Sequence, residues 1–302
     1  MPGYWSFSHY VQKTLWQNKK IFIWLTIVYC LATLLITGLA SEAIYTQARE
    51  TINSSSESLF TGVLGGAGKA GLLIISGLTG AFSAESTNAE SSQQVLLALA
   101  GLLIWLTTVW ILRAILAGRR PKLRDGLYNA GAPILPTFLV ALVIVVQLLP
   151  IAIALFGYGA AVSSGLLDGG VEAMFFWSVA GLLTLLSLYW LSATCIALVV
   201  VTLPGVYPLQ ALRTAGDLVI GRRVRILLRL LWMGLMLIIA WALIAIPIVL
   251  FDEWLKAAWP VVSWLPIVPI TLLVLSSVSV VWTASYIYLL YRKIVDDDAL
   301  PA

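Results

Sequence analysis

Basic side chains are the residues of this sequence that could most readily do chemistry, because they gather in two short polar segments between long apolar runs. The members of the two segments are Arg119, Arg120, Lys122 and Arg124, and then Arg213, Arg222, Arg223, Arg225 and Arg229. Guanidinium groups bind phosphate oxygens, often through two parallel hydrogen bonds. Near a membrane, each such charge adds about 1 kcal/mol of attraction to anionic lipid. Two interpretations stay open: a basic collar that binds lipid headgroups, and charges that only fix the orientation in the bilayer.

Catalytic and metal-binding patterns are missing elsewhere in the sequence. His9 is the only histidine, so a monomer cannot form a metal site with two His ligands. Cys30 and Cys195 lie inside apolar runs without C-x-x-C spacing. The adjacent carboxylates Asp252 and Glu253 are the one pair suited to acid–base work, and we interpret them as solvated charges at the end of a helix. We therefore expect no enzymatic activity, no metal and no cofactor.

The composition is that of an integral membrane protein. The chain has 302 residues, of which 61% are hydrophobic and only 11% charged, whereas soluble domains are about a quarter charged. The net charge of +4 does not indicate a nucleic-acid partner, because the basic residues lie at the boundaries of apolar runs. We expect membrane lipids as partners, and a second copy of the chain or another membrane protein stays open.

Six apolar runs are long enough to be membrane spans. A helix of about 20 residues crosses the roughly 30 Å of hydrocarbon in a bilayer. The runs that reach this length are 21–40, 95–116, 134–156, 173–203, 227–251 and 261–291. The predicted fold class is therefore all-α, a polytopic transmembrane helical bundle of about six spans.

The distribution of charge orients these spans. Fifteen of the eighteen Lys and Arg residues fall near one set of span ends, and only Arg49, Lys69 and Lys256 fall near the other. Short loops rich in Lys and Arg stay in the cytoplasm during insertion. Both termini are therefore predicted to face the cytoplasm, in the cytoplasmic (inner) membrane. The first span is longer than the apolar core of a signal peptide, so we expect an uncleaved anchor.

Residues 1–20 are predicted to form an amphipathic helix on the inner leaflet, separate from the six-span domain at 21–302. Tyr4, Phe7, Val11 and Leu15 recur at helical spacing and give this segment one apolar face.

A second short interfacial helix is expected to begin at Pro208, because proline is favoured in the first turn of a helix. Gly221 suits its end. Its large apolar positions are Leu209, Leu212, Val219 and Ile220. The loop at 121–133 has a related order of residues, which suggests a weak parallel repeat that relates spans two and three to spans four and five.

Residues 41–94 are predicted to form an extracytoplasmic insertion rich in glycine. Within it, 59–82 is apolar enough to resemble a span, yet a seventh crossing would place residues 113–124 outside the cell. Two alternatives stay open for 59–82: a re-entrant hairpin that turns near Lys69, and a packed cap or surface helix.

One stretch of the sequence resembles a known family. Residues 204–236 read PGVYPLQALRTAGDLVIGRRVRILLRLLWMGLM, where a Pro-Leu-x-Ala-Leu segment leads through a short helix to Gly-Arg-Arg and the next span. This order resembles bacterial six-helix inner-membrane proteins related to the membrane domain of glycerophosphoryl diester phosphodiesterases. The N-terminal WQNKKIFIWLTIV is compatible more loosely. The resemblance implies an all-helical membrane domain without catalytic residues, since the phosphodiesterase of those enzymes is a separate domain. The insertion at 59–82 departs from the pattern.

These features predict a non-enzymatic integral membrane protein that is a lipid-interacting or scaffold component of the cytoplasmic membrane. The alternative is a small-molecule transporter or channel, in which 59–82 is re-entrant and polar Ser and Thr side chains of the spans line a path.

Overall fold

The computed structural model describes residues 3–37, 91–164, 169–259 and 266–299. Over these ranges the secondary structure consists of nine α-helices, and no strand is present. Six of the helices are long and apolar enough to cross a membrane. The predicted fold class, an all-α polytopic membrane protein, is confirmed.

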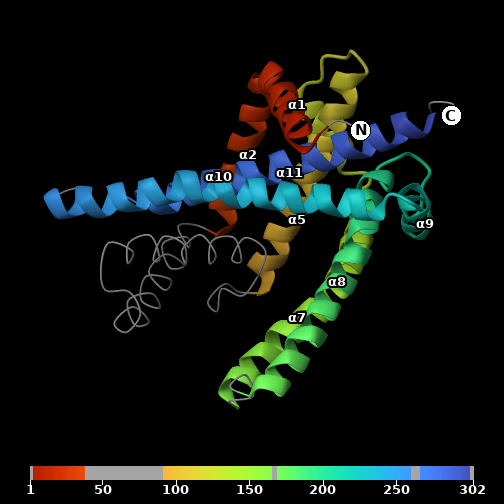
Figure 1. Ribbon diagram of the computed structural model, residues 1–302. Coiled ribbons are helices and arrows are strands. Elements are labelled where there is room, and N and C mark those ends of the chain that lie inside the picture. The colour runs from red at the N-terminus through yellow and green to blue at the C-terminus, as the bar shows by residue number, and fades with distance from the viewer. Residues whose placement is uncertain (1–2, 38–90, 165–168, 260–265, 300–302) are drawn as a thin grey trace. The chain divides into compact units, whose positions relative to one another are not determined.

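The six long helices each overlap one of the predicted spans. They are α2 (Lys19–Thr37), α5 (Ser91–Leu116), α7 (Ile134–Ser163), α8 (Gly170–Val200), α10 (Arg223–Ala258) and α11 (Ile267–Ala299) (Figure 1). Helix α10 begins before the apolar run at 227–251, because arginine is a good helix former and occupies its first turn. Pro150 and Pro247 lie inside α7 and α10, which membrane helices tolerate when other groups bond the freed carbonyls.

Three short helices lie between or before the spans, and α1 and α9 occupy the two segments for which the sequence predicts interfacial helices. They are α1 (Tyr4–Gln17), α6 (Leu123–Ala130) and α9 (Pro208–Val219). Helix α9 begins at Pro208 as expected. Residues 59–82 lie outside the described ranges, so the hairpin and the cap both stay predictions.

The chain divides into two compact units. The first takes the described parts of 1–8, 128–232 and 285–302, and the second takes those of 9–127 and 233–284. In the first unit α7 and α8 lie side by side, and α9 packs against α8 (Figure 1). In the second unit α2 packs against α5.

The buried face of α9 is built from its smallest apolar side chains. Ala211, Ala215 and Val219 recur at four-residue spacing and are fully buried. Leu209 and Ile220, by contrast, are 74% and 65% exposed. Small side chains allow the backbones of two helices to approach closely, so this face of α9 packs against α8 while Leu209 and Ile220 point outward.

The second unit contains a packed core around Trp241. This indole is 2% exposed and packs with Ala245 of α10 and Leu275 of α11. Its Nε1 donates a hydrogen bond of 2.8 Å to the Ser279 hydroxyl oxygen. A buried indole N–H needs such a partner, because hydrocarbon offers none.

Candidate functional site

The structure divides the predicted basic collar between the two units. The members of the earlier segment lie in the second unit, between α5 and the first turn of α6, and all are exposed: Arg119, Arg120, Lys122 and Arg124. The members of the later segment lie in the first unit: Arg213 on α9, then Arg222, Arg223, Arg225 and Arg229 at the junction of α9 and α10. Arg222, Arg223 and Arg225 of this junction line one pocket.

A glycine turn places these arginines. Helix α9 ends at Val219, and Ile220 follows with a non-helical backbone at φ −56° and ψ 132°. Gly221 then has φ 75°, in the left-handed region that favours glycine. The Arg222 N–H donates to the Val219 carbonyl oxygen at 3.0 Å, and the Arg222 carbonyl accepts from Ile226 at 3.0 Å. The chain thus changes direction over two residues, and the arginines follow at the start of α10.

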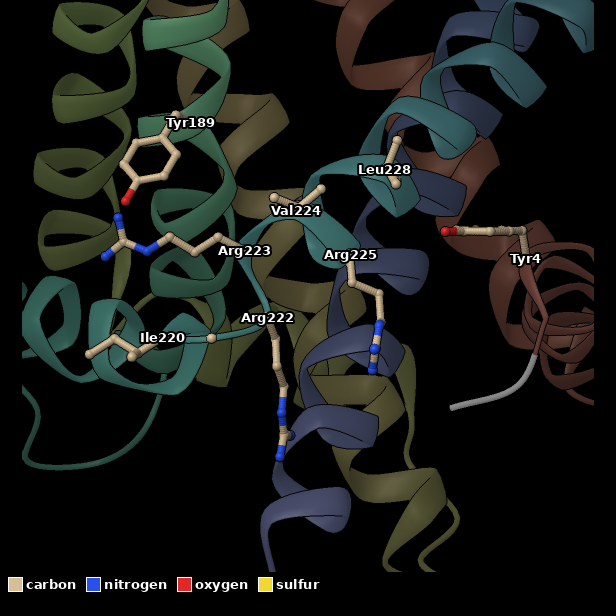
Figure 2. Close-up of a pocket in the computed structure, with 9 residues that line it drawn as sticks. Tyr4, Tyr189, Ile220, Arg222, Arg223, Val224, Arg225 and Leu228 are labelled. Carbon is tan, nitrogen blue, oxygen red and sulfur yellow. The ribbon is translucent and has the colours of Figure 1, made fainter.

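The pocket beside this turn has a volume of about 670 Å³. The residues that line it are Arg222, Arg223, Arg225, Tyr4, Tyr189, Ile220, Gly221, Val224 and Leu228 (Figure 2). Among these lining residues, all within the first unit, none is Asp or Glu. A concave wall with three guanidinium groups and no carboxylate attracts anions. We call it the arginine pocket.

Arg223 is fixed in the arginine pocket by an aromatic ring. Its guanidinium carbon lies 4.7 Å from the ring centroid of Tyr189 on α8, within the range of about 6 Å for cation–π attraction. Figure 2 shows the Arg223 side chain reaching toward that ring. Because the contact already restricts Arg223, less side-chain entropy is lost when a ligand binds.

The arginine pocket is also lined by two further cationic side chains and by apolar side chains of the same helix. Arg222 and Arg225 extend in a common direction from the start of α10 (Figure 2). Val224 and Leu228 lie one turn apart on the same helix and are 68% and 47% exposed. The pocket therefore combines a cationic wall with an apolar edge.

Arg229 has a different environment from the other predicted site residues. It is 2% exposed, and its guanidinium carbon lies 5.4 Å from the ring centroid of Phe7 and 5.9 Å from that of Tyr4. Phe7 packs edge-on against Tyr286, with 5.0 Å between ring centroids. The Tyr286 hydroxyl donates to the Arg229 carbonyl oxygen at 3.2 Å. Arg229 thus joins the first turn of α1 to α10 and α11 within the first unit. We call these four residues the Arg229 cluster.

Trp232 holds the same N-terminal segment from the next turn of α10. Its ring centroid lies 6.3 Å from that of Tyr4 and 6.2 Å from that of Trp5. Its Nε1 donates to the Ser8 hydroxyl oxygen at 3.2 Å. Tyr4 belongs both to the Arg229 cluster and to the wall of the arginine pocket, so the docking of α1 completes that wall.

The hydroxyl groups inside the spans mostly bond to their own helices. Thr107 and Thr108 donate to carbonyl oxygens one turn earlier at 2.7 Å, and Ser277 does so at 2.8 Å. Thr194 of α8 donates to the Gln147 side-chain oxygen of α7 at 2.7 Å. These bonds satisfy polar groups within helices or between neighbouring helices, which is their usual role in membrane proteins.

Asp252 is buried, contrary to the interpretation of the acidic pair as solvated. Its side chain is 1% exposed and accepts a hydrogen bond of 2.8 Å from the Lys256 ammonium group, which is 25% exposed. The sequence places the two at (i, i+4) spacing, and the burial comes from tertiary packing. Among the described residues, no group of three His, Cys, Asp or Glu side chains is placed to hold a metal ion.

Tyr4, Tyr189, Val224 and Leu228 are pocket residues that the sequence did not assign to a site. Tyr4 lies in the predicted interfacial helix at 1–20, and Tyr189 lies near the middle of the predicted span at 173–203. Neither position indicated a contact with particular arginines.

No family model, curated protein or solved structure matches this chain. The resemblance of residues 204–236 to the membrane domain of glycerophosphoryl diester phosphodiesterases therefore stays a prediction.

Proposed function

We propose that this integral membrane protein binds anionic lipid headgroups at the cytoplasmic face of the cytoplasmic membrane. In this proposal it is a lipid-interacting or scaffold component without catalytic activity of its own. The observation that carries the proposal is the arginine pocket, where three guanidinium groups share one concavity of about 670 Å³.

Three properties of the pocket support lipid binding over a role in orientation alone. Charges that only set topology need to be near the membrane, but they need not share a concavity. The Tyr189 ring fixes the position of Arg223, and fixed guanidinium groups suit the bidentate binding of phosphate oxygens. The adjoining apolar side chains of Val224 and Leu228 suit an occupant that is itself part of the bilayer.

The test compares lipid binding by the full chain and a variant that carries Arg222→Gln, Arg223→Gln and Arg225→Gln. The protein is placed in nanodiscs of phosphatidylcholine with a minor fraction of phosphatidylglycerol. The anionic lipid that stays bound after transfer to detergent is then counted by native mass spectrometry. We expect the wild type to retain phosphatidylglycerol selectively. The amount retained by the variant should be at least about tenfold lower, because three charges near the surface contribute about 3 kcal/mol of attraction.

A matched control removes three charges from the same predicted face, through Lys13→Gln, Lys19→Gln and Lys20→Gln. It should retain phosphatidylglycerol as the wild type does. A reporter fused to the C-terminus verifies that both variants keep their orientation. Equal retention of phosphatidylglycerol by the wild type, the arginine variant and the lysine control, all in the correct orientation, would contradict the proposal.

A further inference from the structure

We infer that docking of the start of α1, residues 4–8, is coupled to the binding of an anionic headgroup in the arginine pocket, so that each strengthens the other. Tyr4 carries the coupling, because it takes part in both. This inference rests on the proposed function and adds regulation of the same site. Release of the start of α1 opens the pocket and weakens lipid binding.

Tyr4 has contacts on two sides. It lines the arginine pocket, and its side chain extends from α1 toward the helix that carries Arg225 and Leu228 (Figure 2). Its ring centroid also lies 5.9 Å from the Arg229 guanidinium carbon and 6.3 Å from the ring centroid of Trp232. All of these residues belong to the first unit. One side chain therefore connects the pocket with the contacts that dock α1.

The other docking contacts lie outside the arginine pocket. Phe7 is 1% exposed and packs edge-on against Tyr286, and the Trp232 indole donates a hydrogen bond to the Ser8 hydroxyl oxygen. None of these four residues lines the pocket. Among the described residues that do line it, Tyr4 alone comes from α1. Docking can thus be weakened by substitutions that leave every lining side chain in the sequence.

Docked and released forms of α1 give the pocket different walls. A docked Tyr4 supplies a phenolic hydroxyl, which can donate to a headgroup oxygen. Release removes this donor and admits water on that side, and water weakens the attraction between guanidinium and phosphate groups.

The start of α1 is also a segment that can open locally. Helix ends fray, and segments with exposed side chains open at a lower free energy than the core. Tyr4 is 40% exposed. A ligand that binds more tightly to the docked form must stabilise docking by the same factor, because the coupling is reciprocal.

The experiment measures docking through hydrogen exchange of the backbone amides of residues 7–10. The purified full chain is kept in a mild, uncharged detergent, and equal amounts of phosphatidylglycerol or phosphatidylcholine are added. Phosphatidylglycerol should slow the exchange by at least about fivefold relative to phosphatidylcholine, the lower end of typical couplings. The variant with Arg222→Gln, Arg223→Gln and Arg225→Gln should exchange equally fast with both lipids.

The reciprocal arm weakens docking and measures the affinity for phosphatidylglycerol by native mass spectrometry. Phe7→Ala should lower that affinity by at least about fivefold. Ser8→Ala removes only the hydrogen bond to Trp232 and should lower the affinity less. Trp5→Ala is the control, because Trp5 is 70% exposed and does not line the pocket. It should bind phosphatidylglycerol as the wild type does.

Tyr4→Ala isolates the coupling residue. In this variant Phe7 and Ser8 still dock α1, but phosphatidylglycerol should no longer slow the exchange of residues 7–10. Thermal unfolding identifies any variant that fails to fold, and the exchange of the wild type with the two lipids tests the coupling without any variant.

The other outcomes separate this inference from the proposed function. Lipid binding that depends on the arginines but leaves the exchange of α1 unchanged would overturn the coupling and leave the proposed function intact. Slower exchange that persists in the arginine variant would also overturn it, because α1 would then contact the lipid directly. Lipid binding that is the same in the wild type and the arginine variant would overturn both.

Discussion

Arg222, Arg223, Arg225 and Arg229 lie within two helical turns of one another, yet their surroundings differ. The first three line the arginine pocket, whereas Arg229 is buried among aromatic rings. The sequence could predict the cluster of charge, because that depends only on composition along the chain. It could not separate Arg229 from its neighbours, because the partners Phe7 and Tyr286 are distant in sequence and come together only through packing.

The turn at Gly221 offers the first prediction at the scale of single residues. Gly221→Ala should destabilise the protein by about 1–2 kcal/mol, since a Cβ is disfavoured at φ 75°. Open space surrounds the position, with no heavy atom within 4 Å of the added Cβ, so the cost is in the backbone alone.

The matched control for this turn is Gly216→Ala. Gly216 lies inside α9 and also has no heavy atom within 4 Å of an added Cβ. Alanine should stabilise the helix there by up to about 1 kcal/mol. Thermal unfolding in detergent measures both changes, and the same sign for the two variants would contradict the account of the turn.

The buried carboxylate of Asp252 gives the second prediction. Lys256→Met leaves that carboxylate without its ion-pair partner and should destabilise the protein by about 2 kcal/mol, between the values for exposed and fully buried pairs. Adding Asp252→Asn should recover most of the loss, because the uncompensated charge is removed. Chemical or thermal unfolding of the single and double variants measures this, and a double variant no more stable than the single would refute it.

At the scale of elements, the six spans could be predicted because each is a long apolar run, and hydrocarbon admits few other structures. The ends of the helices could not. Helix α10 begins at Arg223 and α11 continues to Ala299, because backbone hydrogen bonds persist through charged turns that hydropathy excludes. The buried face of α9 was also missed, because a search for large apolar side chains overlooks alanines such as Ala211 and Ala215.

Helix α1 provides the prediction at this scale. Phe7 is 1% exposed and contacts both Arg229 and Tyr286. Phe7→Ala should release the first turn of α1 and lower stability by about 3 kcal/mol, the lower end of the range for such truncations. Limited proteolysis of the N-terminus, together with thermal unfolding, follows both effects.

Trp5→Ala is the control for α1, because Trp5 is 70% exposed and contacts Trp232 only at one edge. It should change stability much less than Phe7→Ala. An N-terminus that stays protected in Phe7→Ala would show that the Arg229 cluster does not hold α1.

At the scale of the whole molecule, the arrangement of charge predicts that both termini face the cytoplasm and that residues 41–94 lie on the opposite side. A reporter active only in the cytoplasm should be active when fused to the C-terminus. Single cysteines placed at Ser54 and Ser86 should react with an impermeant reagent added from outside. An inactive reporter at the C-terminus would contradict the predicted orientation, in which the C-terminus faces the cytoplasm.

Lipid binding at the arginine pocket is tested most directly by identifying the lipids that co-purify with the protein from its own membrane. The wild type and the variant with Arg222→Gln, Arg223→Gln and Arg225→Gln are extracted in the same mild detergent, and the lipids that co-purify with each are quantified. If the arginine pocket binds lipid, the wild type is enriched in anionic phospholipid over the bulk membrane and the variant is not. The same enrichment in both proteins, with both folded and correctly oriented, would contradict the claim that the arginine pocket binds lipid.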